Sequence, residues 1–202
     1  MNIEHIMRIA PVIPVLVVDD RIDPAALAET LVAAGLPVIE VTLRTPEALN
    51  AIRAMAEVEG AIVGAGTVLD ADQLDEAIDA GAKFIVSPGL TERLARAADE
   101  RDVPYLPGVA NAGDIMRGLD LGLSDFKFFP AEAAGGLAAL SALAAPFARA
   151  RFCPTGGIRE NTAANWLAHP SVLCVGGSWL APPGDTDLDS IATRARVAAA
   201  LR

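Results

Sequence analysis

The sequence has few lysines, histidines, cysteines and aromatic residues. Its 202 residues include two histidines and two cysteines, and aromatic side chains supply 4%. Cys153 and Cys174 show neither metal-ligand spacing nor a disulfide framework, so we expect two buried thiols in a reducing compartment. The histidines are isolated and no pair has metal-ligand spacing. We therefore expect no metal and no cofactor.

Positive charge is also scarce, because the net charge is −10 at pH 7. Nucleic acids and anionic membranes bind basic surfaces, so we expect neither as a partner. Residues 1–14 lack the long apolar core and cleavage site of a signal peptide. The longest apolar runs are the length of a strand, far short of a membrane span. The composition predicts a cytoplasmic protein that binds any anion through a few local groups.

Short apolar, β-branched runs alternate with segments of helical periodicity along the whole chain. The runs expected to form strands are 12–18, 38–43, 61–67, 83–89, 103–108, 125–131, 151–157 and 172–180. Helical patterns are clearest at 23–35, 45–60, 70–81, 91–102 and 111–122. Several begin with Asp, Thr or Asn and end with Gly, as helix caps require.

This alternation implies βαβ units and a parallel sheet. Eight units without a break predict a single α/β domain over residues 1–202, a (β/α)8 TIM barrel. A short N-terminal helix near residues 2–9 would close its bottom. A doubly wound sheet is the alternative, because a strand count does not prove closure. Pro14 argues against a regular first strand, since it removes a backbone donor from a central position.

Polar side chains recur on one face of several expected strands. The period of two places Glu40 and Arg44 together, opposite an apolar face that belongs against the helices. Lys127 likewise shares a face with Phe129. The same period groups two further sets: Val63, Ala65 and Thr67, and Arg151, Cys153 and Thr155. One cavity could therefore receive polar groups from four strands, namely Glu40, Arg44, Thr67, Lys127 and Thr155.

The alternative to a functional site is a purely structural one, in which Glu40 forms a salt bridge with Lys127 or Arg44 that fills the centre of the barrel. Buried ion pairs stabilise poorly, because desolvation offsets their attraction. A barrel interior prefers branched apolar residues, so several polar groups at one level favour a functional site.

Two glycine-rich turns, PTGGI at 154–158 and VGGSW at 175–179, follow the last two expected strands. Glycines there expose backbone N–H groups that can bind phosphate. The loops after strands seven and eight are common phosphate sites in such barrels. These turns could hold an anionic ligand despite the acidic composition.

Lys127 is a candidate nucleophile, because desolvation favours a neutral amine, which forms a Schiff base with a ketone. Such a reaction needs a nearby acid/base, and Glu40 is the carboxylate placed best for it. The Arg44 guanidinium suits a substrate carboxylate, and Thr67 could add a hydroxyl. Lys83 is the competing lysine, but it opens its strand at the opposite end of the barrel.

One motif on each strand gives the chain a specific resemblance to a known family. The motifs are PVIPVLVV, VIEVTLRT, VGAGTV, FIVSPGLT, LPGV, FKFFPAE, RFCPTGGI and VLCVGGSWL. Together they resemble the bacterial 2-keto-3-deoxy-6-phosphogluconate (KDPG) aldolases, also called 4-hydroxy-2-oxoglutarate aldolases.

The resemblance implies a homotrimer of barrels and a class I aldolase. Such an enzyme cleaves KDPG to pyruvate and D-glyceraldehyde 3-phosphate in the Entner–Doudoroff pathway, and also 4-hydroxy-2-oxoglutarate. It implies that Lys127 forms the Schiff base, that Glu40 transfers protons and that Arg44 binds the pyruvate carboxylate. Thr67, Pro88 and Phe129 would line the pyruvate pocket. The phosphorylated end would lie against Thr155, Gly156, Gly157, Gly177 and Ser178.

Asp19 and Asp20 depart from the pattern, because relatives can carry basic residues there. Two carboxylates would weaken binding of an anionic substrate unless they point away or Arg21 compensates. Alternative activities are cleavage of the phosphogalactonate epimer, or isomerisation or epimerisation of a phosphosugar with Glu40 as base. A non-catalytic barrel that serves in assembly or ligand binding is the third possibility.

Overall fold

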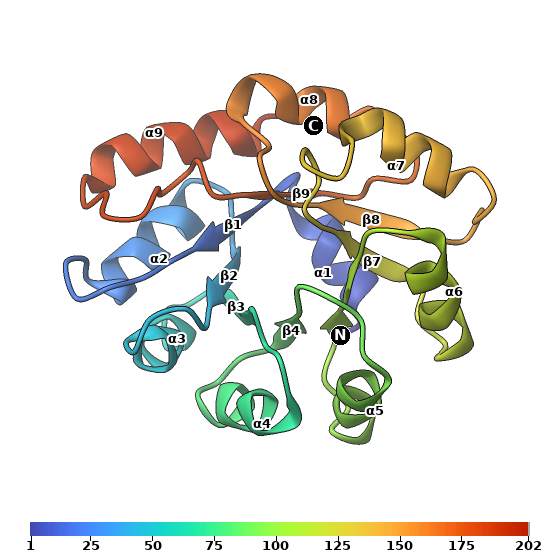
Figure 1. The fold of residues 1–202 in the computed structure, drawn as a ribbon. Coiled ribbons are helices and arrows are strands. Elements are labelled where there is room, and N and C mark those ends of the chain that lie inside the picture. Colours follow the sequence, from blue (N-terminus) through green and yellow to red (C-terminus); the bar gives the residue numbers. More distant parts are fainter. Residues whose placement is uncertain (202) are drawn as a thin grey trace.

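The computed structural model describes residues 1–201, in which short strands lie at the centre and helices surround them (Figure 1). The strands are β1 (Val12–Leu16), β2 (Val38–Thr42), β3 (Ile62–Gly66), β4 (Phe84–Val86), β5 (Tyr105–Leu106), β6 (Gly108–Val109), β7 (Asp125–Phe128), β8 (Arg151–Pro154) and β9 (Val175–Gly177). The helices are α1 (Ile3–Ile9), α2 (Pro24–Ala33), α3 (Ala48–Ala56), α4 (Ala71–Asp79), α5 (Glu92–Glu100), α6 (Ala112–Asp120), α7 (Gly136–Ala144), α8 (Glu160–Leu167) and α9 (Leu188–Ala199). The predicted α/β class is confirmed.

Within residues 1–201 all strand pairs are parallel, and neighbouring strands follow the order of the sequence except where β1 pairs with β9. One sheet has the order β5-β4-β3-β2-β1-β9 and the other the order β6-β7-β8. Isolated bridges from Phe152 to Val172 and from Thr155 to Gly176 link β8 with the segment that contains β9. Because the last strand pairs with the first, this order differs from that of a doubly wound sheet.

The expected strand at 103–108 is divided at Pro107, which separates β5 from β6. A proline has no backbone N–H to donate to a sheet, so regular pairing stops there. The Pro107 carbonyl still accepts a hydrogen bond of 2.8 Å from the backbone N–H of Lys127. β5 pairs with β4 and β6 pairs with β7, so the run joins the two sheets.

Pro14 remains within β1, although it cannot donate to a neighbour. It is the last residue of β1 in the pairing with β9, opposite Gly177, and the pairing with β2 begins at Val15. The missing donor therefore falls where one ladder ends and the other begins.

Several helices begin and end as the sequence predicts. Asp23, Asp70, Thr91 and Asn111 are N-caps whose side chains accept backbone N–H groups. Gly35, Gly60, Gly81 and Gly122 follow helices with positive φ, which glycine adopts without steric cost. The expected start at Thr45 is wrong, because α3 begins at Ala48. The Thr45 hydroxyl instead donates to the Val18 carbonyl at 2.6 Å.

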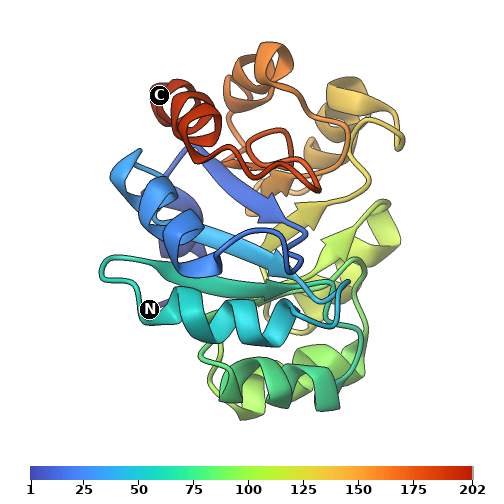
Figure 2. The same ribbon diagram turned by 90° about the vertical axis from the view of Figure 1, so that its left-hand side faces the viewer.

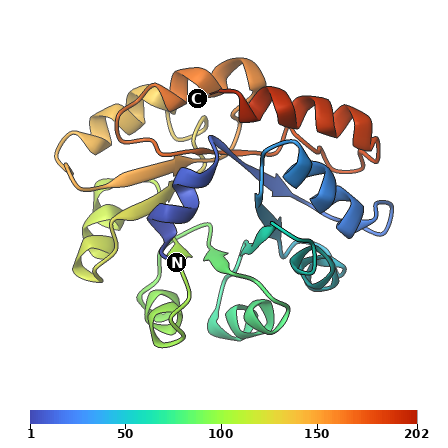
Figure 3. The same cartoon turned by 180° about the vertical axis from the view of Figure 1, so that it is seen from behind.

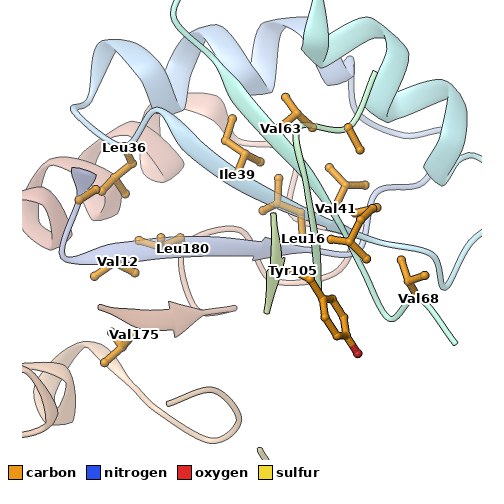
Figure 4. Close-up of a cluster of buried hydrophobic side chains, with 14 of the residues drawn as sticks. Val12, Leu16, Leu36, Ile39, Val41, Val63, Val68, Tyr105, Val175 and Leu180 are labelled. Carbon is orange, nitrogen blue, oxygen red and sulfur yellow. The ribbon is translucent and has the colours of Figure 1, made fainter. Parts of the chain in front are cut away.

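Hydrophobic side chains form two clusters on opposite sides of the strands. The outer cluster fills the space between strands and helices, and Figure 4 shows part of it, including Val12, Ile39, Val41 and Val63. The inner cluster combines Val38, Phe84 and Leu106 with Ile6 and Met7 of α1. Figure 3 shows α1 lying across the middle of the molecule. The predicted N-terminal helix therefore packs against the inward faces of the strands.

The strands point in one direction, so their C-terminal ends lie on one side of the molecule and the N-terminus on the other (Figure 2). Within residues 1–201, no helix has the length and apolar character needed to cross a membrane.

Candidate active site

Lys127 lies on β7 with its ammonium group inside the molecule. Its side chain is 7% exposed, and its Nζ is 2.9 Å from Oε1 of Glu40. Phe126 and Phe128, on either side of it, belong to the outer cluster, and the Phe128 ring lies 6.3 Å from that of Trp166 in α8. The predicted division of this strand between an inward amine and outward aromatic rings is confirmed.

Glu40 approaches Lys127 from β2, 87 residues away in the sequence. Its side chain is 4% exposed, while Ile39 and Val41 on either side belong to the outer cluster. The alternation of β2 therefore directs Glu40 inward, as expected. Because both side chains are so little exposed, each charge is balanced by the other and not by water.

The inward face of β3 differs from the sequence-based expectation. Val63 and Ala65 lie in the outer cluster, so their placement with the site residues is wrong. The inward positions are Gly64 and Gly66. A Cβ atom on Gly64 would lie 2.5 Å from Cε1 of the Phe84 ring, and one on Gly66 would lie 2.7 Å from Cγ of Glu40. The alternating glycines of VGAGT are the signal that could have indicated this face.

Phe129, Thr155 and Gly156 bring the ends of β7 and β8 together beside the ion pair. Nζ of Lys127 is 5.5 Å from the centroid of the Phe129 ring. A Cβ on Gly156 would lie 3.4 Å from the same ring. The backbone N–H of Glu132 donates to the Gly156 carbonyl at 3.0 Å, and Ala131 donates to Thr155 at 2.8 Å. These bonds fix one glycine-rich turn against the loop after Lys127.

The glycine-rich turns have the backbone conformations that the motif suggested. Gly156 and Gly157 have φ of 104° and 80°, which a side chain would strain. The second turn reaches the first where Thr155 pairs with Gly176. Gly177 is buried at the end of β9 and Ser178 is exposed directly after it. The two turns are therefore neighbours at the C-terminal ends of their strands.

Arg44 and Thr67 lie just beyond their strands, so strand alternation does not set where they point. β2 ends at Thr42, and Arg44 is exposed in the turn that follows, with its backbone N–H bonded to the Thr42 carbonyl. β3 ends at Gly66, and Thr67 has φ of 61°, an unusual value for a β-branched residue. Within residues 1–201, neither side chain hydrogen-bonds to the Lys127–Glu40 pair.

Pro88 lies in a turn after β4, and its carbonyl packs against Gly108, the register partner of Lys127. The Ser87 hydroxyl donates to the Gly89 carbonyl at 2.7 Å. It also shares a buried hydrogen bond of 2.6 Å with the Tyr105 hydroxyl, and burial raises the pKa of Tyr105 to about 12. This small network, which sequence reasoning missed, holds the turn that carries Pro88.

Arg21 compensates one of the two unexpected carboxylates after β1. Its Nε lies 3.0 Å from Oδ2 of Asp19, and its backbone N–H donates to Oδ1 at 3.1 Å. The side-chain hydrogen bond from Arg21 lowers the pKa of Asp19. Asp20 is exposed to solvent. Asp19 is thus already paired with a cation of its own loop.

The remaining candidate features lie elsewhere. Lys83 is exposed before β4, at the amino end of the strands. A cavity of about 410 Å³ lies near Ile3 and Tyr105, and another of about 480 Å³ lies between α5 and α6. Neither is lined by Lys127 or Glu40. Among the described residues, no group of three or more His, Cys, Asp or Glu side chains could hold a metal ion.

Together, the fold and the buried lysine–glutamate pair define an α/β protein that holds an amine against a carboxylate near the C-terminal ends of its strands. Comparison with known proteins agrees. The family described as KDPG and KHG aldolase matches residues 3–194. The 2-dehydro-3-deoxy-phosphogluconate aldolase of Zymomonas mobilis is 56% identical, with 100% of this chain and 97% of the relative covered. The KHG/KDPG aldolase of Escherichia coli K12 is 54% identical, over 89% of this chain and 84% of the relative.

Solved structures give the same result. The 2-keto-3-deoxy-6-phosphogluconate aldolase of Zymomonas mobilis superposes with a TM-score of 0.98, covering 100% of this chain and 98% of that one. The KDPG aldolase of Legionella pneumophila, with pyruvate captured as a covalent carbinolamine intermediate, is 40% identical with a TM-score of 0.93; the match covers 97% of each chain. The chain belongs to the KDPG and KHG aldolase family.

Proposed function

We propose that this chain is a class I aldolase that cleaves KDPG to pyruvate and D-glyceraldehyde 3-phosphate, and that also cleaves 4-hydroxy-2-oxoglutarate. The observation that carries the proposal is the buried contact of 2.9 Å between Lys127 Nζ and Glu40 Oε1. It unites an amine with a proton acceptor at the end of the strands where such folds carry their chemistry.

In this mechanism Lys127 becomes nucleophilic by passing a proton to Glu40. The neutral amine attacks the C2 ketone of the substrate, and loss of water from the carbinolamine gives a protonated imine. Removal of the proton from the C4 hydroxyl breaks the C3–C4 bond and releases the aldehyde. The bonding electrons pass into the imine and form an enamine. Protonation at C3 and hydrolysis then release pyruvate and restore Lys127.

The other residues of the site have proposed roles in binding. Arg44 is exposed and makes no ion pair within residues 1–201, so its guanidinium is available to bind the pyruvate carboxylate. Thr67, Pro88 and Phe129 line the pyruvate pocket. The phosphorylated end of the substrate lies at Thr155, Gly156, Gly157, Gly177 and Ser178, where backbone N–H groups can bind an anion.

We also propose one closed eight-stranded barrel that comprises the whole chain as a single domain. The pairing of β1 with β9 and the bridge from Thr155 to Gly176 support closure. Assembly as a homotrimer and a cytoplasmic location remain predictions, which sedimentation analysis and cell fractionation can test.

Borohydride trapping tests the proposed chemistry. The protein is reduced in the presence of pyruvate, digested and examined by peptide mass mapping. We expect a reduced pyruvyl adduct on Lys127 and none on Lys83, the other lysine of the chain, which serves as an internal control. No adduct on Lys127 would refute the mechanism. Values of kcat/KM for KDPG, its phosphogalactonate epimer and 4-hydroxy-2-oxoglutarate then rank the substrates.

A further inference from the structure

Gly66, the last residue of β3, lies directly behind the carboxylate of Glu40. A Cβ atom at this position would lie 2.7 Å from Cγ and 2.8 Å from Cδ of Glu40, and closer still to Oε1. Oε1 is the oxygen that accepts the hydrogen bond from Lys127. Glycine therefore leaves room for the Glu40 carboxylate, whereas the Cβ atom of any other residue at this position would occupy the same space.

The backbone of Gly66 is held in place from both sides. Its carbonyl accepts a hydrogen bond of 2.8 Å from the backbone N–H of Leu43, and its Cα pairs with that of Thr42 in β2. Two residues later, Val68 donates to the Val86 carbonyl at 3.1 Å. Gly66 does not have a positive φ. A glycine is therefore required here for space and not for backbone conformation, because the strand cannot easily move away from Glu40.

We propose that Gly66 is a positioning residue that sets the location of the Glu40 carboxylate against Lys127. This inference rests on the proposed function. The atoms that would collide with a new methyl, Oε1, Cγ and Cδ, all belong to the Glu40 side chain and none to the backbone. We therefore expect Gly66→Ala to move the carboxylate and to retain the fold. A misplacement of about 1 Å in a catalytic group can cost about 10²-fold in rate, so we expect kcat to fall by about that factor.

Gly64 offers a matched control on the same face of the same strand. A Cβ there would lie 2.5 Å from Cε1 of Phe84, which is fully buried in the inner cluster, and its three nearest atoms all belong to that ring. Gly64→Ala thus also overfills the interior, but it meets an apolar ring. We expect a lower melting temperature with an unchanged pH profile of kcat. Gly66→Ala should show the reverse, a near-normal melting temperature with a lower kcat and an altered pH profile.

A double-mutant cycle with Glu40→Ala separates positioning from a general structural role. Glu40→Ala removes the side chain that the new methyl would displace, so Gly66→Ala should cause no further loss of kcat in that background. Independent, multiplying losses would overturn the inference, as would a kcat for Gly66→Ala within threefold of the wild type. If Gly66→Ala alone fails to fold, recovery of cooperative melting in the double variant supports the clash with Glu40, and its failure overturns the inference.

A crystal structure of Gly66→Ala provides a readout that does not depend on turnover. We expect the distance from Glu40 Oε1 to Lys127 Nζ to exceed that of a hydrogen bond, and an unchanged distance would overturn the inference. Failure of the proposed function is distinguishable, because it would leave wild-type Lys127 without a pyruvyl adduct even if the carboxylate of the variant is displaced.

Discussion

The two ends of the strands bury charge in different ways. At the carboxyl end, Lys127 and Glu40 are both nearly inaccessible, and each is the partner of the other. At the amino end, Asp125 is 8% exposed on the same strand as Lys127, and its Oδ1 has no hydrogen-bond partner among residues 1–201. Its other oxygen, Oδ2, accepts a hydrogen bond of 3.0 Å from the Ser124 hydroxyl. A paired buried charge can serve chemistry, whereas an incompletely partnered one mainly costs stability.

Among the variants that test this comparison, Lys127→Met should have the largest effect, because it should lower both activity and stability. Without the amine no imine forms, so we expect kcat/KM to fall by about 10⁴-fold or more. The variant also leaves the Glu40 carboxylate buried without its cation, which typically costs about 3–5 kcal/mol of unfolding free energy. Steady-state kinetics and urea denaturation at pH 7 measure the two losses. Lys83→Met is the matched control and should retain wild-type values.

Removing both charges should separate stability from activity. In the Lys127→Met/Glu40→Gln variant no ion remains unpaired in the interior, so we expect recovery of about 2 kcal/mol or more relative to Lys127→Met. Activity should remain absent. A double variant no more stable than the single one would show that the loss arises from packing and not from the unpaired carboxylate.

At the amino end, Asp125→Asn should raise stability at neutral pH by about 1–2 kcal/mol, because it removes a buried and incompletely bonded charge. Burial is the main cause that raises the pKa of Asp125; Glu4 raises it further, while Ser124, Arg151 and Arg8 oppose the shift. A raised folded-state pKa favours the folded state at low pH, and this advantage is lost as the pH rises through that pKa. The gain from Asn should therefore shrink as the pH falls toward the ordinary value of 3.8.

Thermal melts between pH 3 and pH 8 test this expectation, with activity as the control. Asp125 is the first residue of β7, two residues before Lys127, and it has no proposed role in the reaction, so we expect kcat to change little. A constant difference between Asp125→Asn and the wild type over this range would contradict the assignment of the effect to titration.

Tyr105→Phe should have the smallest effect, a loss of about 1 kcal/mol, because it removes the hydroxyl bonded to Ser87. The pKa of Tyr105 rises from 10.0 to about 12 on folding. The contribution of its hydroxyl to the unfolding free energy is therefore complete below pH 10 and is lost as the pH rises toward 12. The difference from the wild type should thus narrow over that interval in chemical denaturation. A difference independent of pH would show that the phenol titrates alike in both states.

Periodicity predicted most of the elements and the central pair, because β2 and β7 are buried strands with strict alternation. It failed where strands end early. Thr67 follows the last residue of β3 with a positive φ, and Arg44 lies in a turn, so neither obeys a period of two. Periodicity was also misleading for β3, where glycines have no side chain to mark the inward face. Sequence patterns do not record which side chain will fill the space that Gly66 leaves.

The pairing of β1 with β9 has a consequence for synthesis of the chain. Val12 pairs with Val175, so one edge of β1 has no native neighbour until residue 175 has left the ribosome. An unpaired strand edge can associate with other chains, and contacts between distant residues slow folding. The nascent chain should therefore depend on β9, which is synthesised more than 150 residues after β1, to protect this edge. A chain truncated before residue 175 should aggregate, even though it would contain both Lys127 and Glu40.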